Sequence, residues 1–195
     1  MTLAILIPAA GASSRMGGRD KLMEDIDGQP LLLRQVTRAL ATGAPVFVTT
    51  RQDRPARIAA LRGTTVQLVP VEAPQEGLAA SIRAGIAALP QETSAAMILL
   101  PDLPDIETDD MTTMIKEHLR QPNLVLRAVA EDGTPGHPTL FPASFFDELA
   151  QITGDHGAGP LLKEIGFAPV PLRGKRAVTD LDTPEAWEAW HKANG

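Results

Sequence analysis

The chain of 195 residues contains no cysteine, which excludes disulfide bonds and thiolate metal sites. This composition fits a reducing cytoplasm, which is the location that we expect. No apolar run approaches the ~20 residues that a membrane span needs. The first eight residues are too short for the apolar core of a secretory signal, and we find no internal repeat or low-complexity tail.

Positive charge is also scarce. The chain has 18 Lys and Arg against 24 Asp and Glu, a formal net charge of −6 and a pI near 5.2. We therefore expect no general affinity for nucleic acid or for membrane surfaces, although a local basic cleft is compatible with these values. The apolar content of 44% and the length are typical of a globular protein with one domain.

Short aliphatic runs alternate with segments of helical periodicity. This alternation predicts an α/β fold with a mostly parallel central sheet that helices cover on both faces. Ligands of such sheets bind beyond the carboxyl ends of the strands. The expected strands are residues 3–8, 46–50, 66–69, 97–100, 124–129 and 177–179. The expected helices are residues 30–43, 54–61, 77–89, 109–120, 145–152, 161–165 and 184–193, the last with Thr183 as its N-cap.

The first strand runs into a loop of small residues with two cations, in "AILIPAAGASSRMGGRDKLM", residues 4–23. Small residues let backbone N–H groups approach an anion, and Arg15 and Lys21 would match a phosphate chain. The residue types alone leave open a surface loop whose cations are simply solvated. Two common phosphate motifs are excluded, because Leu22 follows Lys21 and because position 13 is serine.

Acidic residues follow another buried strand in "ILLPDLPDI". Asp102 would stand at the sheet edge opposite the loop, where Mg²⁺ could bind a carboxylate together with phosphate oxygens. Asp105 is the nearby rival, and turn or cap roles would also explain both residues. A second acidic pair, Asp180 and Asp182, lies in "AVTDLDTPEAW", where helix capping is the alternative explanation.

The complete loop pattern resembles the signature of the MobA-like nucleotidyltransferases, which activate small phosphorylated molecules. The matching positions, which precede "DGQPLL", are Gly11, Ser13, Arg15, Met16, Gly17 and Lys21. The resemblance implies a three-layer Rossmann-like fold in which the loop wraps a nucleotide triphosphate that Arg15 and Lys21 stabilise.

The same resemblance extends to the acidic segments. The family's usual "GDMP" is similar to "PDLP" here, which implies that Asp102 binds a catalytic Mg²⁺, with Mn²⁺ as a substitute. Pro101 and Leu103 depart from that pattern. The family's "DIDTPEDL" is similar to "DLDTPEAW" and implies a second metal ligand, either Asp180 or Asp182. Arg15, Lys21 and Asp102 are thus the expected catalytic residues.

Five segments resemble one branch of the family, the MocA-like molybdenum cofactor cytidylyltransferases. They are "PAAGASSRMGG", "EGLAASIRAG", "GHPTLF", "GDHGAGPLL" and "DLDTPEAW". For the nucleotide, this resemblance implies that Ala9 and Ala10 narrow the base pocket and that Gly77 and Ser81 reach the base. For the acceptor, it implies contacts from His137, Asp155 and His156. Gly159 stands where the branch commonly has arginine, so the chain departs from the pattern on the acceptor side.

The function implied is transfer of CMP from CTP, or of another nucleotide, to molybdenum-bearing molybdopterin. The products would be molybdopterin cytosine dinucleotide and pyrophosphate, and the partner a molybdenum hydroxylase or its chaperone. One nucleotidyltransferase domain would span residues 1–195, with a nucleotide-binding part of roughly 1–105 and an acceptor-binding part of roughly 106–195. Guanylyltransferases, isoprenoid-pathway cytidylyltransferases and a non-catalytic cofactor carrier remain as alternatives.

Overall fold

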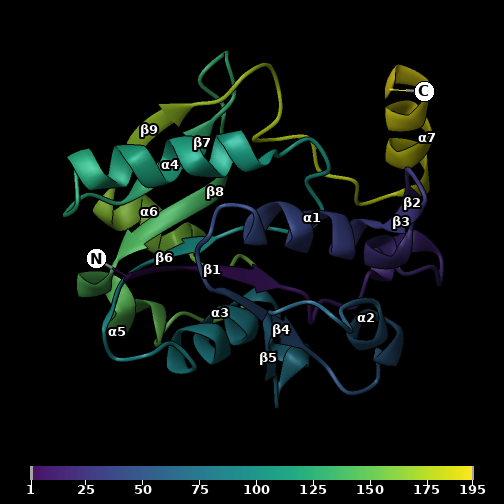
Figure 1. Ribbon diagram of the computed structural model, residues 1–195, viewed down its shortest axis with the longest axis horizontal. Helices are drawn as coiled ribbons and strands as arrows, with labels where there is room; N and C mark the ends of the chain where they lie inside the picture. The colour runs from purple at the N-terminus through teal and green to yellow at the C-terminus, as the bar shows by residue number, and fades with distance from the viewer. Residues whose placement is uncertain (1, 195) are drawn as a thin grey trace.

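The computed structural model describes residues 2–194, which form a seven-stranded sheet in the order β5-β4-β1-β6-β8-β7-β9 (Figure 1). Only β8 runs against its two neighbours, and every other neighbouring pair is parallel. The mostly parallel sheet predicted from the sequence is therefore confirmed. The strands are β1 (Thr2–Pro8), β4 (Val46–Thr50), β5 (Gln67–Pro70), β6 (Thr93–Ile98), β7 (Leu126–Val129), β8 (Pro135–Pro142) and β9 (Ala168–Pro171).

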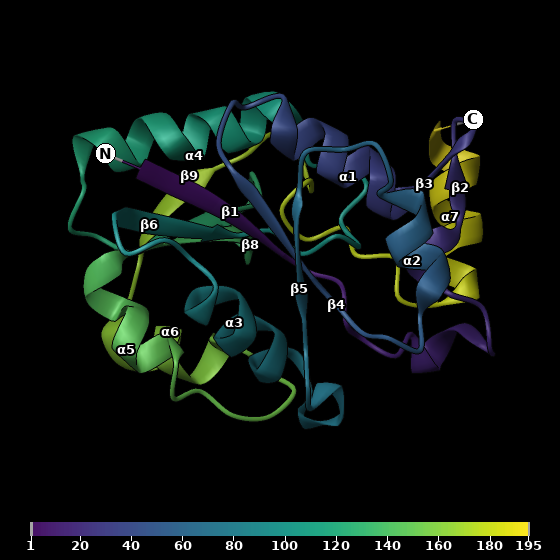
Figure 2. The ribbon, with the colours of Figure 1, turned by 60° about the horizontal axis from the view of Figure 1, so that its bottom comes forward.

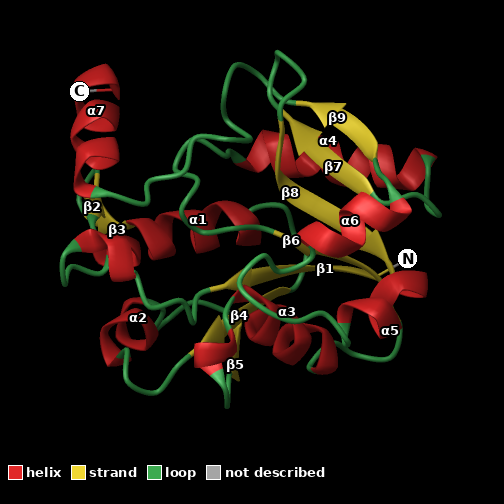
Figure 3. Cartoon of the chain, turned by 180° about the vertical axis from the view of Figure 1, so that it is seen from behind, coloured by secondary structure: helices red, strands yellow, loops and turns green. Residues whose placement is uncertain are grey.

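Helices cover both faces of the sheet and complete three layers, as in the Rossmann-like fold that we expected (Figure 2). Helices α1 and α4 lie on one face, and α3, α5 and α6 lie on the other. A small hairpin of β2 and β3 lies beside α7 at one end of the molecule (Figure 3). These elements are β2 (Asp25–Ile26), β3 (Gln29–Pro30), α1 (Leu31–Leu40), α2 (Pro55–Ala60), α3 (Leu78–Ala87), α4 (Thr108–Arg120), α5 (Phe146–Leu149), α6 (Gly159–Ile165) and α7 (Pro184–Asn194). Four short 3₁₀ turns are η1 (Ser14–Met16), η2 (Lys21–Met23), η3 (Pro74–Glu76) and η4 (Ala143–Phe145).

Strand β1 is buried on both faces, which explains its continuous aliphatic run. Ile5 and Ile7 belong to the apolar cluster that includes residues of α1 and α4, whereas Leu6 faces the opposite side. Gly85 lets α3 lie very close to β1, because a Cβ atom there would stand 2.2 Å from Leu6 Cδ1. This tight packing fixes the C-terminal half of α3 against β1.

The structure corrects the sequence-based elements in the proline-rich half of the chain. Residues 177–179 were expected as a strand, but Val178 N–H and Thr179 N–H both bond to the carbonyl of Lys175 in a turn. Strands β8 and β9 were not expected, because proline cannot donate to a sheet ladder. Strand β9 carries its prolines at an edge of the sheet. Strand β8 begins and ends with a proline, and Pro138 lies where its register with β7 shifts.

The expected helices are all present, with ends that shift by a few residues. In place of one helix over residues 145–152, the structure has η4 at Ala143–Phe145 followed by the short α5 at Phe146–Leu149. Thr183 caps α7 as predicted, because its Oγ1 accepts from Ala186 N–H at 3.3 Å. None of the helices within residues 2–194 has the length and apolar character needed to cross a membrane.

Candidate active site

A cavity of about 610 Å³ lies at the carboxyl ends of β1 and β6, and we call it the loop cavity. It brings together segments that are far apart in the chain, as expected for a sheet of this kind. Its walls include, among other residues, Gly11, Ser13, Arg15, Lys21, Gly77, Ser81, Asp102, Asp155 and Asp182.

Two cations and two carboxylates meet in this cavity. Lys21 Nζ lies 2.5 Å from Asp102 Oδ2 and 2.5 Å from Asp182 Oδ1. Arg15 Nη1 lies 2.6 Å from Asp182 Oδ2. Burial acts to lower the pKa of Lys21, but the two carboxylates outweigh it, so that the pKa is raised and the ammonium stays charged.

Backbone hydrogen bonds hold the two carboxylates side by side. Leu99 N–H donates to the Leu6 carbonyl at 2.9 Å, which extends the pairing of β1 and β6 toward Asp102. Leu181 N–H then donates to the Asp102 carbonyl at 3.0 Å. The segment before α7 is thereby tied to the end of β6. Asp182 is the residue after Leu181, so this bond holds it beside Asp102.

The carboxylates are chemically suited to a divalent cation. Asp102 Oδ1 is buried and has no hydrogen-bond partner, although its other oxygen bonds to Lys21. Within residues 2–194 no group of three or more His, Cys, Asp or Glu side chains could hold a metal ion unaided. Asp102 and Asp182 thus match the usual protein contribution to a Mg²⁺ site, one or two carboxylates completed by phosphate oxygens and water.

Arg57, on α2, anchors the loop that follows β1. Its guanidinium is buried and donates to the carbonyls of Ala9 at 2.6 Å and Gly11 at 2.7 Å. It also donates to Ser13 Oγ at 3.0 Å and to Asp20 Oδ1 at 2.7 Å. Burial acts to raise the pKa of Asp20, but bonding to Arg57 outweighs it and the pKa is lowered.

This anchoring holds an unusual backbone conformation. Ser13 has a φ of 54°, in the left-handed region that residues other than glycine seldom adopt. Arg54 adds a bond from Nη2 to the Ala12 carbonyl at 2.8 Å. Arg57 and Asp20 were not among the residues predicted from the sequence, although arginines at 51, 54 and 57 recur every third residue just after β4.

The start of α3 forms another wall of the loop cavity. Gly77 has a φ of 81°, and a Cβ atom there would stand 2.0 Å from Asp155 Oδ1. Ala79 N–H donates to the Gly154 carbonyl at 3.1 Å, so the two segments are in direct contact. Ser81, one turn further along α3, is buried in the same wall.

Ala9 and Ala10, whose methyl groups were expected to narrow a base pocket, are not among the residues that line the cavity. Ala9 packs into the main apolar cluster, and Ala10 packs with Val71 and with Ala80 of α3. Their backbone continues the course of β1, so both side chains point into the interior. Any influence of Ala10 on a nucleotide would therefore act through the position of α3.

His137 lies on β8 outside the cavity wall. Its ring Nδ1 is buried without a hydrogen-bond partner. Burial, and then the charge of Arg127, lower the pKa of His137 to about 4, although Asp102 acts in the opposite direction. The imidazole is therefore neutral near pH 7 and carries no charge for an anionic acceptor.

Three other acidic or basic candidates lie away from the cavity. His156 and Asp180 are exposed and do not line it, whereas Asp155 and Asp182 do. Asp105 points elsewhere and accepts a hydrogen bond from Trp190 Nε1 at 2.8 Å. The structure thus places one member of each predicted acidic pair in the loop cavity, Asp102 and Asp182.

Comparison with known proteins agrees with this arrangement. Residues 5–170 match the MobA-like NTP transferase domain. The chain is 34% identical over 105 residues to a probable molybdenum cofactor guanylyltransferase of Natronomonas pharaonis. That alignment covers 53% of this chain and 51% of the relative, so the matched part spans about half of that protein.

Solved structures share the fold over almost the whole chain. Rv0371c of Mycobacterium tuberculosis superposes with a TM-score of 0.85 at 23% identity, covering 98% of each chain. Its complex with manganese gives 0.82 at 20% identity, covering 99% of this chain and 100% of that one. A CMP:2-keto-3-deoxy-manno-octonic acid synthetase complexed with CTP gives 0.78 at 16% identity, covering 100% and 98%. With a domain match over most of its length, the chain belongs to the MobA-like NTP transferase family.

Proposed function

We propose that this nucleotidyltransferase transfers CMP from CTP to molybdenum-bearing molybdopterin, giving molybdopterin cytosine dinucleotide and pyrophosphate. The observation that carries the proposal is the cluster of Lys21 with Asp102 and Asp182, at 2.5 Å from each, beside a loop of small residues. Cations next to free backbone N–H groups favour a triphosphate, and carboxylates at the same place favour a metal.

The reaction needs positioning and charge stabilisation more than covalent chemistry. An oxygen of the acceptor phosphate attacks the α-phosphorus of CTP and forms a new P–O bond. The bond from the α-phosphorus to its bridging oxygen breaks, and pyrophosphate leaves with that electron pair. Arg15 and Lys21 exchange carboxylate partners for phosphate oxygens and so balance the charge of the leaving group.

Asp102 and Asp182 would hold Mg²⁺, and the unpartnered Asp102 Oδ1 supports this assignment. The bound metal would supply positive charge to the phosphates. In the structure the two carboxylates raise the pKa of Lys21, and phosphate oxygens that took their place would likewise favour the charged ammonium. Manganese as a substitute is supported by the manganese complex of Rv0371c, which has the same fold.

We further propose that residues 1–195 act as one domain, because both parts of the chain line the loop cavity. Lys21 and Asp102 come from the proposed nucleotide-binding part, and Asp155 and Asp182 from the proposed acceptor-binding part. Asp155 is the candidate acceptor contact best placed for this role. His137 and His156 would need to be reached by an acceptor that extends beyond the cavity.

GTP is the second candidate donor, because the relative from Natronomonas pharaonis is named a guanylyltransferase. CTP is supported by the CTP complex of a protein with the same fold. The packing of Ala10 against Ala80 offers an indirect route to selectivity, since α3 carries Gly77 and Ser81 into the cavity wall. A change in pocket shape of about one methyl group is worth roughly 1–3 kcal/mol, so we expect a partial preference for CTP over GTP.

The test is pyrophosphate release by the purified chain with molybdenum-bearing molybdopterin, using CTP and GTP in parallel. We expect kcat/KM to be about 10–100-fold higher for CTP. Activity should vanish with EDTA and return with Mg²⁺ or Mn²⁺. A preference for GTP would show that GTP rather than CTP is the donor. Turnover in EDTA would show that the reaction needs no metal. No turnover with either nucleotide would favour a cofactor carrier.

A further inference from the structure

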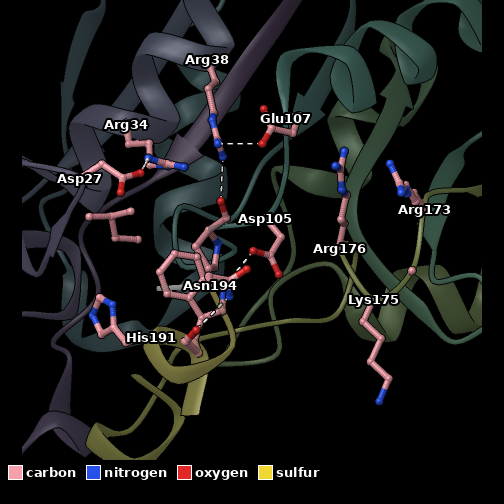
Figure 4. Close-up of a pocket in the computed structure, with 14 residues that line it drawn as sticks. Asp27, Arg34, Arg38, Asp105, Glu107, Arg173, Lys175, Arg176, His191 and Asn194 are labelled. Atoms are coloured by element: carbon pink, nitrogen blue, oxygen red, sulfur yellow. Dashed lines mark hydrogen bonds and ion pairs between the residues drawn. The ribbon is translucent and has the colours of Figure 1, made fainter. Parts of the chain in front are cut away.

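A second cavity, of about 550 Å³, lies between α1, the loop after β6, the turn after β9 and α7, and we call it the basic cavity. It shares no lining residue with the loop cavity. Figure 4 shows Arg34 and Arg38 on one side and Arg173, Lys175 and Arg176 on the other. The volume falls within the range of about 300–1,000 Å³ that is typical of sites for small molecules.

The walls of this cavity are positive although the chain as a whole is negative. Five cations line it against three carboxylates, those of Asp27, Asp105 and Glu107. The chain has a formal net charge of −6. A concave surface with one predominant sign of charge concentrates ligands of the opposite sign.

Some of these cations already have structural partners. Arg38 donates to the carbonyls of Pro104 at 2.7 Å and Ile106 at 2.8 Å, and to Glu107 Oε1 at 2.9 Å. Arg176 pairs with Asp110 at 3.1 Å. These bonds hold the wall in place, because they tie α1 and the turn after β9 to the start of α4.

Other donors remain available to a ligand. Arg173 and Lys175 form no ion pair within the part of the chain that the structure describes, residues 2–194. Arg34 pairs through Nη1 with Asp27, an exposed carboxylate, and its Nε is buried without a partner. A buried N–H without an acceptor is costly, and an anionic oxygen would satisfy it.

The cations are also close enough to repel one another. Burial, and then the charge of Arg34, lower the pKa of Arg38, and Arg176 adds to this in spite of Glu107 and Asp105. Such repulsion opposes folding unless a counter-charge offsets it. Arginine is the side chain that best matches the oxygens of a phosphate, which it can bind with two parallel hydrogen bonds.

We propose that the basic cavity is a second ligand site, which binds a small molecule carrying one or more phosphate groups. Arg173, Lys175 and Arg34 would contact the phosphate oxygens, while Arg38 and Arg176 hold the walls. The proposal is independent of the donor and acceptor assigned above, because the two cavities have no residue in common.

The chain carries a suitable reporter, since it has only two tryptophans. Trp190 lines the basic cavity and donates from Nε1 to Asp105, whereas Trp187 is buried and donates to the Leu181 carbonyl. The indole N–H signals of ¹⁵N-labelled protein can be followed by NMR while pyrophosphate is added in the presence of EDTA. We expect a saturable shift of the Trp190 signal that is larger than that of Trp187.

Variants then locate the site. Arg173→Ser with Lys175→Ser should weaken the binding seen at Trp190 by roughly tenfold or more, the scale of lost charged hydrogen bonds. The control Arg62→Ser with Lys163→Ser removes the same charge from exposed positions that line neither cavity, and it should leave the affinity unchanged. Lys21→Ala, which alters the loop cavity, should preserve the Trp190 shift.

Three probes distinguish the source of the phosphate: pyrophosphate, CTP and glucose 6-phosphate. Binding of pyrophosphate indicates an inorganic ligand, and binding of CTP or glucose 6-phosphate alone indicates an organic one; both outcomes support the proposal. The proposal is overturned if no probe shifts Trp190 saturably, if both double variants weaken binding equally, or if Lys21→Ala abolishes the shift.

Discussion

Lys21 stands between two carboxylates that would otherwise repel each other. Asp102 and Asp182 are 80 positions apart in the chain, yet both lie 2.5 Å from the same ammonium group. A charged side chain of this kind preserves the geometry of the cluster before any phosphate or metal arrives. The residue that we propose for phosphate binding therefore also assembles the carboxylates.

Asp102→Asn tests the catalytic assignment with little change of shape. We expect turnover to fall roughly 100-fold or more, because the metal that would supply positive charge to the phosphates loses a charged ligand. The melting temperature should stay within a few degrees of wild type, since Lys21 keeps its bond to Asp182. The measurement is steady-state pyrophosphate release together with thermal unfolding.

Asp105→Asn is the matched control, three residues away. Its side chain keeps an oxygen that can accept from Trp190, and it lies outside the loop cavity. Turnover should change by no more than a few-fold. If Asp105→Asn inactivates the protein and Asp102→Asn does not, our choice of carboxylate is wrong.

Arg57→Met tests how the loop is held. The substitution leaves the Asp20 carboxylate without its buried partner, and breaking such a pair costs about 3–5 kcal/mol. The loop carbonyls of Ala9 and Gly11 also lose their donor, so KM for the nucleotide should rise. Urea unfolding and nucleotide kinetics measure the two effects separately.

Two further variants serve as controls for Arg57→Met. Arg54→Met removes one hydrogen bond to the Ala12 carbonyl and a longer ion pair, at 3.9 Å, with Asp20, and it should cost about 1 kcal/mol. Arg57→Lys retains the charge for Asp20 and should recover part of the stability but less of the KM, because lysine cannot serve several acceptors in a plane. Equal stability of Arg57→Met and Arg54→Met would contradict the anchoring role.

Much of this site could be predicted from the sequence, but only the charged residues that follow the end of a predicted strand. Lys21 and Asp102 could be placed together because both follow strands at one edge of the sheet. Arg57 could not, since an arginine on a short helix is usually solvated and its burial depends on the loop that it contacts. The packing of Ala9 and Ala10 depends on the backbone course beyond β1, which their residue type does not specify.

At the scale of elements, prolines caused the clearest errors. Strands β8 and β9 both have apolar positions, but their prolines argue against a ladder. Strand β9 accommodates its prolines at the sheet edge, and β8 accommodates Pro138 where its register with β7 shifts. The parallel strands β1, β4 and β5 were predicted within one residue because aliphatic runs define them directly. The C-terminal half of the fold, whose strands lack long aliphatic runs, was thus predicted less well.

The start of α3 provides a prediction with an internal control. Gly77→Ala and Gly166→Ala both place alanine in a backbone region that is essentially restricted to glycine, at φ 81°, ψ −160° and φ 74°, ψ −178°, which should cost each about 1–3 kcal/mol. Only at Gly77 would the new Cβ meet Asp155 Oδ1, at 2.0 Å, whereas Gly166 has nothing within 4 Å. We expect Gly77→Ala alone to raise the nucleotide KM, roughly tenfold, and to unfold at lower urea concentration. Similar values of the nucleotide KM for both variants would show that Asp155 can move aside without affecting nucleotide binding.

The acid stability of the whole molecule should depend on His137. Its pKa is about 4 in the folded chain and about 6.5 when unfolded, so the unfolded chain binds more protons between these values. Stability is therefore lost as pH falls from about 6.5 to about 4, by roughly 3 kcal/mol in total.

His137→Gln cannot be protonated in this window. Between pH 7 and pH 4.5 its free energy of unfolding should fall about 2–3 kcal/mol less than that of wild type. His191→Gln, at an exposed position of α7, should behave as wild type. Urea unfolding at the two pH values measures the difference, and parallel losses in all three proteins would refute the role of His137.

The bond between Leu181 N–H and the Asp102 carbonyl also determines when, during translation, the charged cluster can form. The ribosome makes the chain from its N-terminus, so Lys21 and Asp102 emerge while residue 182 has yet to be added. A nascent chain can form the first parallel strands, but it lacks the carboxylate that lies 161 positions beyond Lys21. The cluster is therefore assembled late in translation, and a ribosome-stalled fragment that ends before residue 180 would contain Lys21 and Asp102 but not Asp182.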